Sequence, residues 1–304
     1  MSKHPTLLQQ FRSFCLQNNA DDMEKALAYF TVFGGTSWKV DMNIPLLELI
    51  ETKILKNYSY IHNDIAKITF SNKHSHALLS AMATGDRRMY STFKRAHLSR
   101  EEGEATLDTL LDVGLIRMEY ALERPLKEED DTSDKLSFMT PFMRFWFAFI
   151  SPYYKSIKEG YYSEFKEAFT HREQEFSALV FQKLCFELLK KMILEENVTE
   201  VGSYWDRYVE IDILAKTDEG RMFAGSTKFT TAKIKKSELA KLKEHCEKAE
   251  IAPDVYVIFS KNGFSSELKS LKGDTLKLFS LKHFKRLLDD LNEKELIPCS
   301  GKKY

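Results

Sequence analysis

The sequence predicts a mixed helix-and-strand protein (α+β or α/β). A helical N-terminal half containing a winged helix-turn-helix is followed by a mixed β-sheet flanked by helices. Apolar residues recur at helical spacing through most of residues 1–123, whereas short β-type runs gather after residue 197. A lysine-rich helical segment separates the third of these runs from the fourth, as expected for a crossover between parallel strands.

Length and charge set the first limits on organisation and function. The chain has 304 residues, which favours two domains over one, and it is 43% hydrophobic. Its 45 basic and 45 acidic side chains balance, so the simplest argument for nucleic-acid binding, a strongly basic chain, is missing. Locally charged faces remain compatible with this balance.

The cysteines and the apolar runs predict a cytoplasmic protein with no membrane contact. Four scattered cysteines form no CxxC metal motif and favour reduced thiols (Cys15, Cys185, Cys246 and Cys299). The most apolar stretch, 141–154, contains Arg144 and is shorter than the ~20 residues of a membrane helix. No GxxxxGK[ST] motif occurs, so the sequence predicts no P-loop ATP site.

Residues 75–122 have the outline of a winged helix-turn-helix: three predicted helices and then a strand-like run. The third helix, which begins at Arg100, is acidic and would be repelled by phosphate. The second helix and the turn before it are more basic, and they are the candidate DNA contacts of this region (Arg87, Arg88, Lys94 and Arg95). DNA contact through these residues and docking of a protein partner both stay open.

We place the domain boundary in a polar, acidic stretch. Residues 127–135 lack any hydrophobic periodicity and fit a solvated linker or the tip of a wing. The predicted division is therefore a helical and winged-helix domain at 1–123, a linker at 124–138 and a second domain at 139–304.

The sequence predicts helices and five strands in the second domain. Helices are expected at 140–170, 173–193 and 237–250, and strands at 198–205, 209–216, 221–229, 254–260 and 276–280. On the strands, Glu210 and Asp212 share one face, as do Ser226 and Lys228, because alternate residues point the same way. Antiparallel pairing would bring these two faces into one cleft.

This spacing resembles the PD-(D/E)XK, or restriction-endonuclease-like, fold. The resemblance implies a Mg²⁺ or Mn²⁺ site with Asp212 as a metal ligand and Lys228 near the attacking water. Active members carry a carboxylate where this chain has Ser226, and Gln182 lines up with an acidic helix position. Asp212 with protein carbonyls and water could still hold Mg²⁺ weakly, and Glu210, Glu187 or Glu175 are candidates for a displaced ligand.

A second resemblance covers most of the chain. Segments similar to the C-terminal region of archaeal-type P-loop ATPases, with its domain of unknown function, occur in order at 28–40, 75–122, 144–152, 159–162, 181–189, 203–215 and 223–229. This resemblance implies a lid remnant, a winged helix and a nuclease-like domain. The ATPase core would lie before residue 1, so the expected protein is a freestanding C-terminal portion.

Lysines concentrate directly after the candidate site strand. Lys233, Lys235 and Lys236 open a helical segment that also carries further lysines, and they are candidate DNA contacts. An ordinary solvated helix face is the structural alternative.

Three hypotheses for function follow. The preferred one is a non-catalytic, nucleic-acid-associated protein whose nuclease-like site has degenerated, with no certain cofactor. The second is a divergent Mg²⁺- or Mn²⁺-dependent DNA nuclease that uses Asp212 and Lys228. The third is a protein-interaction module whose acidic winged helix docks a separately encoded ATPase.

Overall fold

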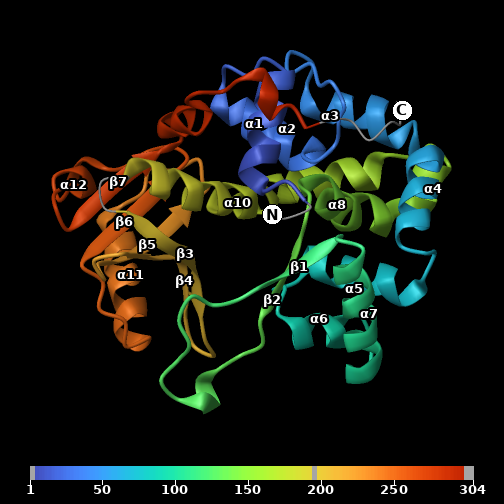
Figure 1. Ribbon diagram of the computed structural model, residues 1–304. Coiled ribbons are helices and arrows are strands. Elements are labelled where there is room, and N and C mark those ends of the chain that lie inside the picture. The colour runs from blue at the N-terminus through green and yellow to red at the C-terminus, as the bar shows by residue number, and fades with distance from the viewer. Residues whose placement is uncertain (1–3, 194–196, 298–304) are drawn as a thin grey trace. The chain divides into compact units, whose positions relative to one another are not determined.

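The computed structural model describes residues 4–193 and 197–297, which form two compact units (Figure 1). Unit 1 contains the residues up to Glu119, residues Ser133–Glu173 and the residues from Asn292 onward. Unit 2 contains Tyr120–Thr132 and Gln174–Leu291. The units are therefore interleaved along the chain, unlike the predicted division at 124–138.

Helices build most of unit 1, as the sequence predicts. They are α1 (Leu7–Gln17), α2 (Met23–Phe33), α3 (Leu46–Ile50), α4 (Tyr58–Ile68), α5 (Lys73–Thr84), α6 (Met89–Arg95) and α7 (Arg100–Asp112). Capping boxes fix two of their starts: Thr6 with Gln9 at α1, and Ser99 with Glu102 at α7. Gly34 caps the end of α2, where the two glycines predict a break.

A small antiparallel hairpin follows α5, α6 and α7. Strand β1 (Ile116–Glu119) pairs with β2 (Lys135–Phe138), and Ile116 lies opposite Phe138. Arg87, in the turn before α6, forms an ion pair of 2.9 Å with Glu119 of β1, and both side chains are largely buried. Three helices and a hairpin thus form one packed region within unit 1.

The aromatic segment after β2 belongs to unit 1 rather than to the second domain that the sequence predicts at 139–304. It comprises α8 (Pro141–Phe145), a π-helical turn (Trp146–Ile150) and α9 (Tyr154–Lys158). The Trp146 ring stacks on Tyr58 with ring centroids 5.7 Å apart, and the Phe142 N–H donates to the Gly34 carbonyl. The aromatic segment completes the helical core of unit 1. Sequence periodicity alone does not assign this segment to either domain.

One long helix, α10 (Ser163–Met192), replaces the two separate helical segments expected at 140–170 and 173–193. No glycine or proline interrupts its 30 residues, so nothing in the sequence stops it. Its residues up to Glu173 belong to unit 1, and those from Gln174 belong to unit 2.

Unit 2 contains the predicted mixed sheet of five strands. They are β3 (Val198–Trp205), β4 (Glu210–Thr217), β5 (Met222–Lys228), β6 (Val255–Ser260) and β7 (Leu276–Ser280), in that spatial order. The β3–β4 and β4–β5 pairs are antiparallel, whereas β5–β6 and β6–β7 are parallel. Helix α11 (Lys236–Lys248) forms the crossover from β5 to β6, and the short α12 (Ser266–Lys269) precedes β7.

Helical segments cover the sheet. A 3₁₀ helix at Leu281–Leu288 places Phe284 on Phe181 of α10, with the rings stacked and their centroids 5.1 Å apart. On α11, Leu242 and Cys246 pack in a cluster with Ile211 and Leu214 of β4. The fold therefore has the helices and the mixed sheet that the sequence predicts.

The acidic stretch predicted as a linker or wing tip packs in unit 2. It connects β1 to β2, and residues 120–132 lie in that unit. The Leu122 N–H donates to the Ser203 carbonyl of β3, and the Arg207 N–H donates to the Asp130 carbonyl. These main-chain bonds hold the segment in place, which a charge pattern does not reveal.

Within the described ranges, no helix is both long enough and apolar enough to cross a bilayer.

Close packing at Gly103 generates a first prediction. A Cβ at this position of α7 would lie 2.5 Å from Cγ of Phe93 on α6. Gly103→Ala should therefore lower the free energy of unfolding by about 1–3 kcal/mol, although alanine is the better helix former. Urea unfolding measures this change. Gly273→Ala, whose Cβ meets nothing within 4 Å, is the control and should change little. Equal effects of the two substitutions would contradict the packing argument.

Candidate functional site

Two neighbouring strands bring the predicted polar residues together. In the β4–β5 pair, Ile213 lies opposite Gly225, so the next positions outward are Asp212 and Ser226. Asp212, Ser226 and Lys228 all line one pocket of about 190 Å³, together with Glu210. The antiparallel pairing and the shared cleft expected from the sequence are both present.

Asp212 is held by the backbone and side chain of β5. Its Oδ2 accepts hydrogen bonds from the Thr227 N–H at 2.7 Å and the Thr227 hydroxyl at 3.2 Å. The Ser226 hydroxyl lies 3.5 Å from the same oxygen. These interactions fix the carboxylate just beyond the Ile213–Gly225 pair, where the β4–β5 ladder ends.

Glu238 also lines the pocket, although the sequence did not predict it as a site residue. It lies in the first turn of α11, and its Oε1 accepts a hydrogen bond of 2.7 Å from the Ser226 hydroxyl. The same oxygen lies 3.0 Å from Nζ of Lys228. A carboxylate from α11 thus occupies the space next to the position where Ser226 replaces the expected acidic residue.

The environment moves the two carboxyl groups in opposite directions. Burial raises the pKa of Asp212, and the nearby Lys228 and the Thr227 N–H offset this only in part, while Glu210 adds repulsion. Burial also acts to raise the pKa of Glu238, but the Ser226 hydrogen bond and Lys228 outweigh it, so its pKa is lowered. The site therefore contains one carboxylate that is costly to ionise beside one that ionises easily.

Gln182 supports the site from α10 instead of lining it. Its side-chain amide donates to the Asp212 carbonyl oxygen at 2.9 Å and lies 3.3 Å from Oγ of Ser203. The Ser203 hydroxyl donates to the same carbonyl at 2.8 Å. The neutral Gln182 thus fixes the main chain of Asp212.

Of the three glutamates that the sequence offers as displaced ligands, one lines the pocket and two do not. Glu187 and Glu175 of α10 do not line the pocket, and Glu187 lies 3.5 Å from Lys190. Glu210 lines the pocket, and Nδ1 of His245 lies 3.0 Å from its carbonyl oxygen. The second carboxylate comes instead from a helix that follows the strands in the chain.

The oxygen donors of this pocket suit a divalent metal ion in kind, but they are few. Two carboxylates and a hydroxyl are the hard oxygen donors that Mg²⁺ and Mn²⁺ accept. In the part of the chain that the structure describes, no three His, Cys, Asp or Glu side chains group together in a way that would hold a metal ion. Protein donors for a metal would therefore be few, and water would have to complete the coordination.

The lysine-rich surface lies on α11 and the segment before it. Lys233 and Lys235 are exposed, and Lys236 lies 3.6 Å from Glu267 of α12. Lys241 lines the same pocket as Asp212 and Glu238. Helix α11, labelled in Figure 1, thus carries Glu238, and the candidate DNA-contacting lysines lie at its start or just before it.

The basic residues of the helical region differ in accessibility. Arg87 forms an ion pair with Glu119 and also donates to the Leu136 carbonyl at 3.3 Å, so its guanidinium is already engaged within unit 1. Lys94 and Arg95 are exposed at the end of α6, and Arg88 at its N-cap is half-buried.

A comparison with protein families matches the stretch that carries this site. Residues 146–242 match the family DUF234, described as archaeal and bacterial proteins of unknown function. The match covers less than half of the chain and includes Gln182, Asp212, Ser226, Lys228 and Glu238. Comparisons with curated proteins and with solved structures give no match.

Because burial raises the pKa of Asp212, we expect the ionised carboxylate to destabilise the folded protein. Asp212→Asn should raise the melting temperature at pH 8, because the amide oxygen can still accept from Thr227 without a buried charge. The pKa of Asp212 is higher in the folded than in the unfolded protein, so its ionisation destabilises the fold. This destabilisation is complete at pH values above the raised pKa and disappears below about pH 4, the ordinary pKa of an aspartate. Thermal unfolding at pH 8 and pH 4 measures this difference.

Asp212→Ala is the matched control. It leaves the Thr227 donors unpaired and should lower the free energy of unfolding by about 1–3 kcal/mol. An Asn variant less stable than the wild type at pH 8 would show that the charged carboxylate stabilises the fold.

Proposed function

We propose that unit 2 is a divalent-metal-dependent nuclease that cleaves phosphodiester bonds of DNA. The observation that carries the proposal is the contact of Glu238 with both Ser226 and Lys228 beside Asp212. It supplies a second carboxylate where the sequence alone shows a neutral serine. This reverses the order of the hypotheses drawn from the sequence, which favoured a degenerate site.

The residues of the pocket fit a Mg²⁺ or Mn²⁺ ion by their chemistry. Asp212 and Glu238 would hold it, because both present carboxylate oxygens to one small pocket. Such an ion supplies Lewis-acid polarisation of a phosphoryl oxygen and lowers the pKa of bound water. A nearby cation would also favour the ionised form of Asp212, whose charge is otherwise disfavoured by burial.

Lys228 is the proposed phosphate-facing cation. Its ammonium is held by Glu238 at 3.0 Å and its side chain is only partly exposed, so it is oriented within the pocket. A positioned ammonium stabilises the negative charge that develops during phosphodiester cleavage. Gln182 is a positioning residue, because it acts through the Asp212 main chain.

DNA is the proposed substrate because of the surface next to the pocket. The exposed Lys241 lines the pocket, and the exposed Lys233 and Lys235 lie in the segment just before α11; all three would neutralise phosphates. The resemblance of strands and site to the PD-(D/E)XK fold supports the same substrate class. The free, buried Cys15, Cys185 and Cys246 fit the reducing cytoplasm in which such a protein would work.

A second candidate is the non-catalytic, DNA-associated module preferred from the sequence. It is favoured by the absence, within the described residues, of a group of three potential metal ligands. In this case the interactions among Asp212, Lys228 and Glu238 only stabilise the fold, and the lysine surface alone contacts DNA. The winged helix would then bind DNA through Lys94 and Arg95, or would dock a protein such as a separately encoded ATPase through its acidic α7.

Cleavage of plasmid DNA with added Mg²⁺ or Mn²⁺ tests the nuclease directly. The wild type should nick plasmid, and Asp212→Ala, Glu238→Gln and Lys228→Ala should each lower the rate by about 10²-fold or more, since metal and charge interactions supply several kcal/mol. Glu244→Gln, on the same helix in an exposed pair with Lys248, should cleave like the wild type.

Exchanging the side chains at positions 226 and 238 tests whether the Glu238 carboxylate binds metal or is only structural. Glu238→Ser should inactivate the protein, and adding Ser226→Glu should restore part of the activity, because the two side chains approach within 2.7 Å. Undetectable cleavage by a folded wild type that still binds DNA would favour the second candidate. Cleavage that survives all three site substitutions would come from a contaminant.

Salt-dependent DNA binding tests the lysine surface separately. Replacing Lys233, Lys235 and Lys236 by alanine should weaken binding in gel shifts. It should also reduce the slope of log K against log salt by about 0.9 for each phosphate that is no longer neutralised. Lys94→Ala with Arg95→Ala is the comparison in unit 1. A larger effect of that pair would move the DNA site to the winged helix, and no binding at low salt would favour the protein-docking role.

A further inference from the structure

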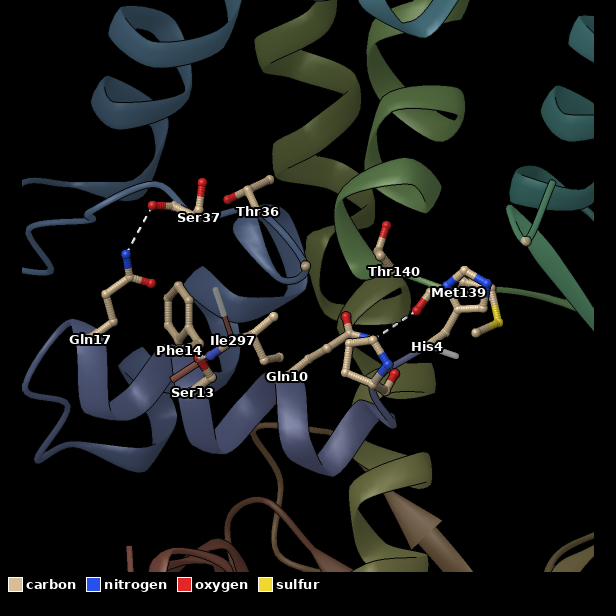
Figure 2. A pocket seen from close by; sticks show the side chains of 13 residues that line it. His4, Gln10, Ser13, Phe14, Gln17, Thr36, Ser37, Met139, Thr140 and Ile297 are labelled. Atoms are coloured by element: carbon tan, nitrogen blue, oxygen red, sulfur yellow. Dashed lines mark hydrogen bonds between the residues drawn. The ribbon is translucent and has the colours of Figure 1, made fainter. Parts of the chain in front are cut away.

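A cavity beside α1 in unit 1 and the carboxylate pocket of unit 2 differ in how their polar side chains are used. The α1 cavity, of about 200 Å³, is lined by two glutamine amides that hold α1 to neighbouring segments. Gln17 donates to the Ser37 carbonyl and Gln10 donates to the Met139 carbonyl, both at 2.9 Å (Figure 2). The carboxylate pocket, in contrast, contains a polar atom of His245 that is not used in this way.

His245 lines the carboxylate pocket from α11. Glu238, Lys241 and His245 follow one another at intervals of three and four residues, which places them on one face of the helix. The helix contacts β5 through the Glu238 carboxylate, and it contacts β4 where His245 meets the carbonyl oxygen of Glu210. The pocket is therefore bounded by two strands and by one face of α11, which carries a carboxylate in its first turn and an imidazole further along.

The contact with Glu210 determines which ring nitrogen of His245 carries the proton. Nδ1 lies 3.0 Å from the main-chain carbonyl oxygen of Glu210, and a carbonyl oxygen can only accept. Nδ1 is therefore the protonated nitrogen of the neutral ring, and the lone pair is on Nε2. Within the described ranges Nε2 makes no hydrogen bond, and it is not among the buried polar atoms that lack a partner, so solvent reaches it. The structure thus presents an oriented and accessible proton acceptor at the pocket.

The site residues assigned under the proposed function are less suited to accept a proton. Lys228 is paired with Glu238 at 3.0 Å, and an ammonium group has no lone pair. Oδ2 of Asp212 accepts two hydrogen bonds from Thr227, and the oxygen of Glu238 that meets Lys228 also accepts from Ser226. Carboxylates are moreover weaker bases than imidazole, by roughly two pKa units in model peptides. A nuclease that uses water as its nucleophile therefore gains a better general base from His245 than from these residues.

We propose that His245 is the general base of the nuclease, an inference that rests on the function proposed for unit 2. Nε2 takes a proton from a water molecule as the oxygen of that water bonds to phosphorus. The bond between phosphorus and the leaving sugar oxygen breaks, the leaving oxygen takes a proton from solvent, and the imidazolium returns its proton to solvent. The Glu210 carbonyl positions the ring, because it accepts from Nδ1 in both the neutral and the charged state.

Plasmid cleavage with Mg²⁺ by a His245→Asn variant of the full chain tests this role. The asparagine amide can replace the Nδ1 donor to Glu210 but offers no base, so the rate should fall by about 10²-fold or more while DNA affinity in gel shifts stays the same. His171→Asn, at an exposed position of α10 in unit 1, is the matched control and should cleave like the wild type. Unchanged cleavage by His245→Asn, or a loss explained by weaker DNA binding, would overturn the inference but not the nuclease proposal.

Chemical rescue separates a general base from a side chain that only supports the fold. His245→Ala should cleave as slowly as His245→Asn, and added imidazole should raise its rate about tenfold. The stronger base 4-methylimidazole should raise the rate further, whereas the wild type should not respond to either compound. Mg²⁺ is the metal of choice for this assay, because it prefers oxygen ligands to imidazole. Absence of rescue, or rescue that does not increase with base strength, would overturn the inference.

The tautomer of His245 can be measured without metal or DNA. NMR of the imidazole nitrogens in the wild type should show the neutral ring protonated at Nδ1, and the signal that is missing in His245→Asn identifies this ring. A neutral ring protonated at Nε2 would overturn the inference whether or not the protein cleaves DNA. A folded wild type that cleaves no DNA with either metal would instead overturn the nuclease proposal, and this inference with it.

Discussion

The hydrogen bond from the Thr227 N–H to the Asp212 carboxylate is the interaction on which the rest of the candidate site depends. The β4–β5 ladder runs from Lys216 opposite Met222 to Ile213 opposite Gly225. Beyond that point a side chain of β4, not its backbone, satisfies the N–H of β5. The two strands therefore separate at the position where the polar residues gather, and the pocket opens between them.

Helix α11 covers the gap that this separation leaves. Leu242 and Cys246 pack in one cluster with residues of β4 and β5, and the first turn of the helix reaches Ser226 and Lys228. The apolar packing thus determines which polar residue meets the strands. Glu238 satisfies the Ser226 hydroxyl and the Lys228 ammonium at once, which keeps a partly buried serine, lysine and glutamate from remaining unpaired.

The sequence predicted the strands of unit 2 well because each is a short β-type run bounded by polar residues, as at Val198–Trp205. It also placed Asp212 and Lys228 on neighbouring strands, since the two-residue period fixes the face of a strand. It did not reveal Glu238, because the rotation of α11 over the sheet depends on tertiary packing. A glutamate in the first turn of a lysine-rich helix directly after the site strand was the available signal.

Domain organisation was harder to predict for a related reason. The aromatic segment around Trp146 is apolar on nearly all sides, so its pattern does not say which neighbours bury it. The acidic stretch near Asp130 looks solvated by composition, yet its backbone bonds to Arg207. Composition describes side chains, whereas these assignments are decided by main-chain bonds and long-range packing.

The interleaving of the two units has a consequence for synthesis of the protein. Arg12 of α1 pairs with Glu295, and Ser13 accepts the Ile297 N–H, so α1 is completed by residues that follow unit 2 in the chain. All of unit 2 is translated between these partners. Unit 1 therefore cannot finish folding in the usual N-to-C order, because α1 lacks these partners until residues 295–297 have been synthesised.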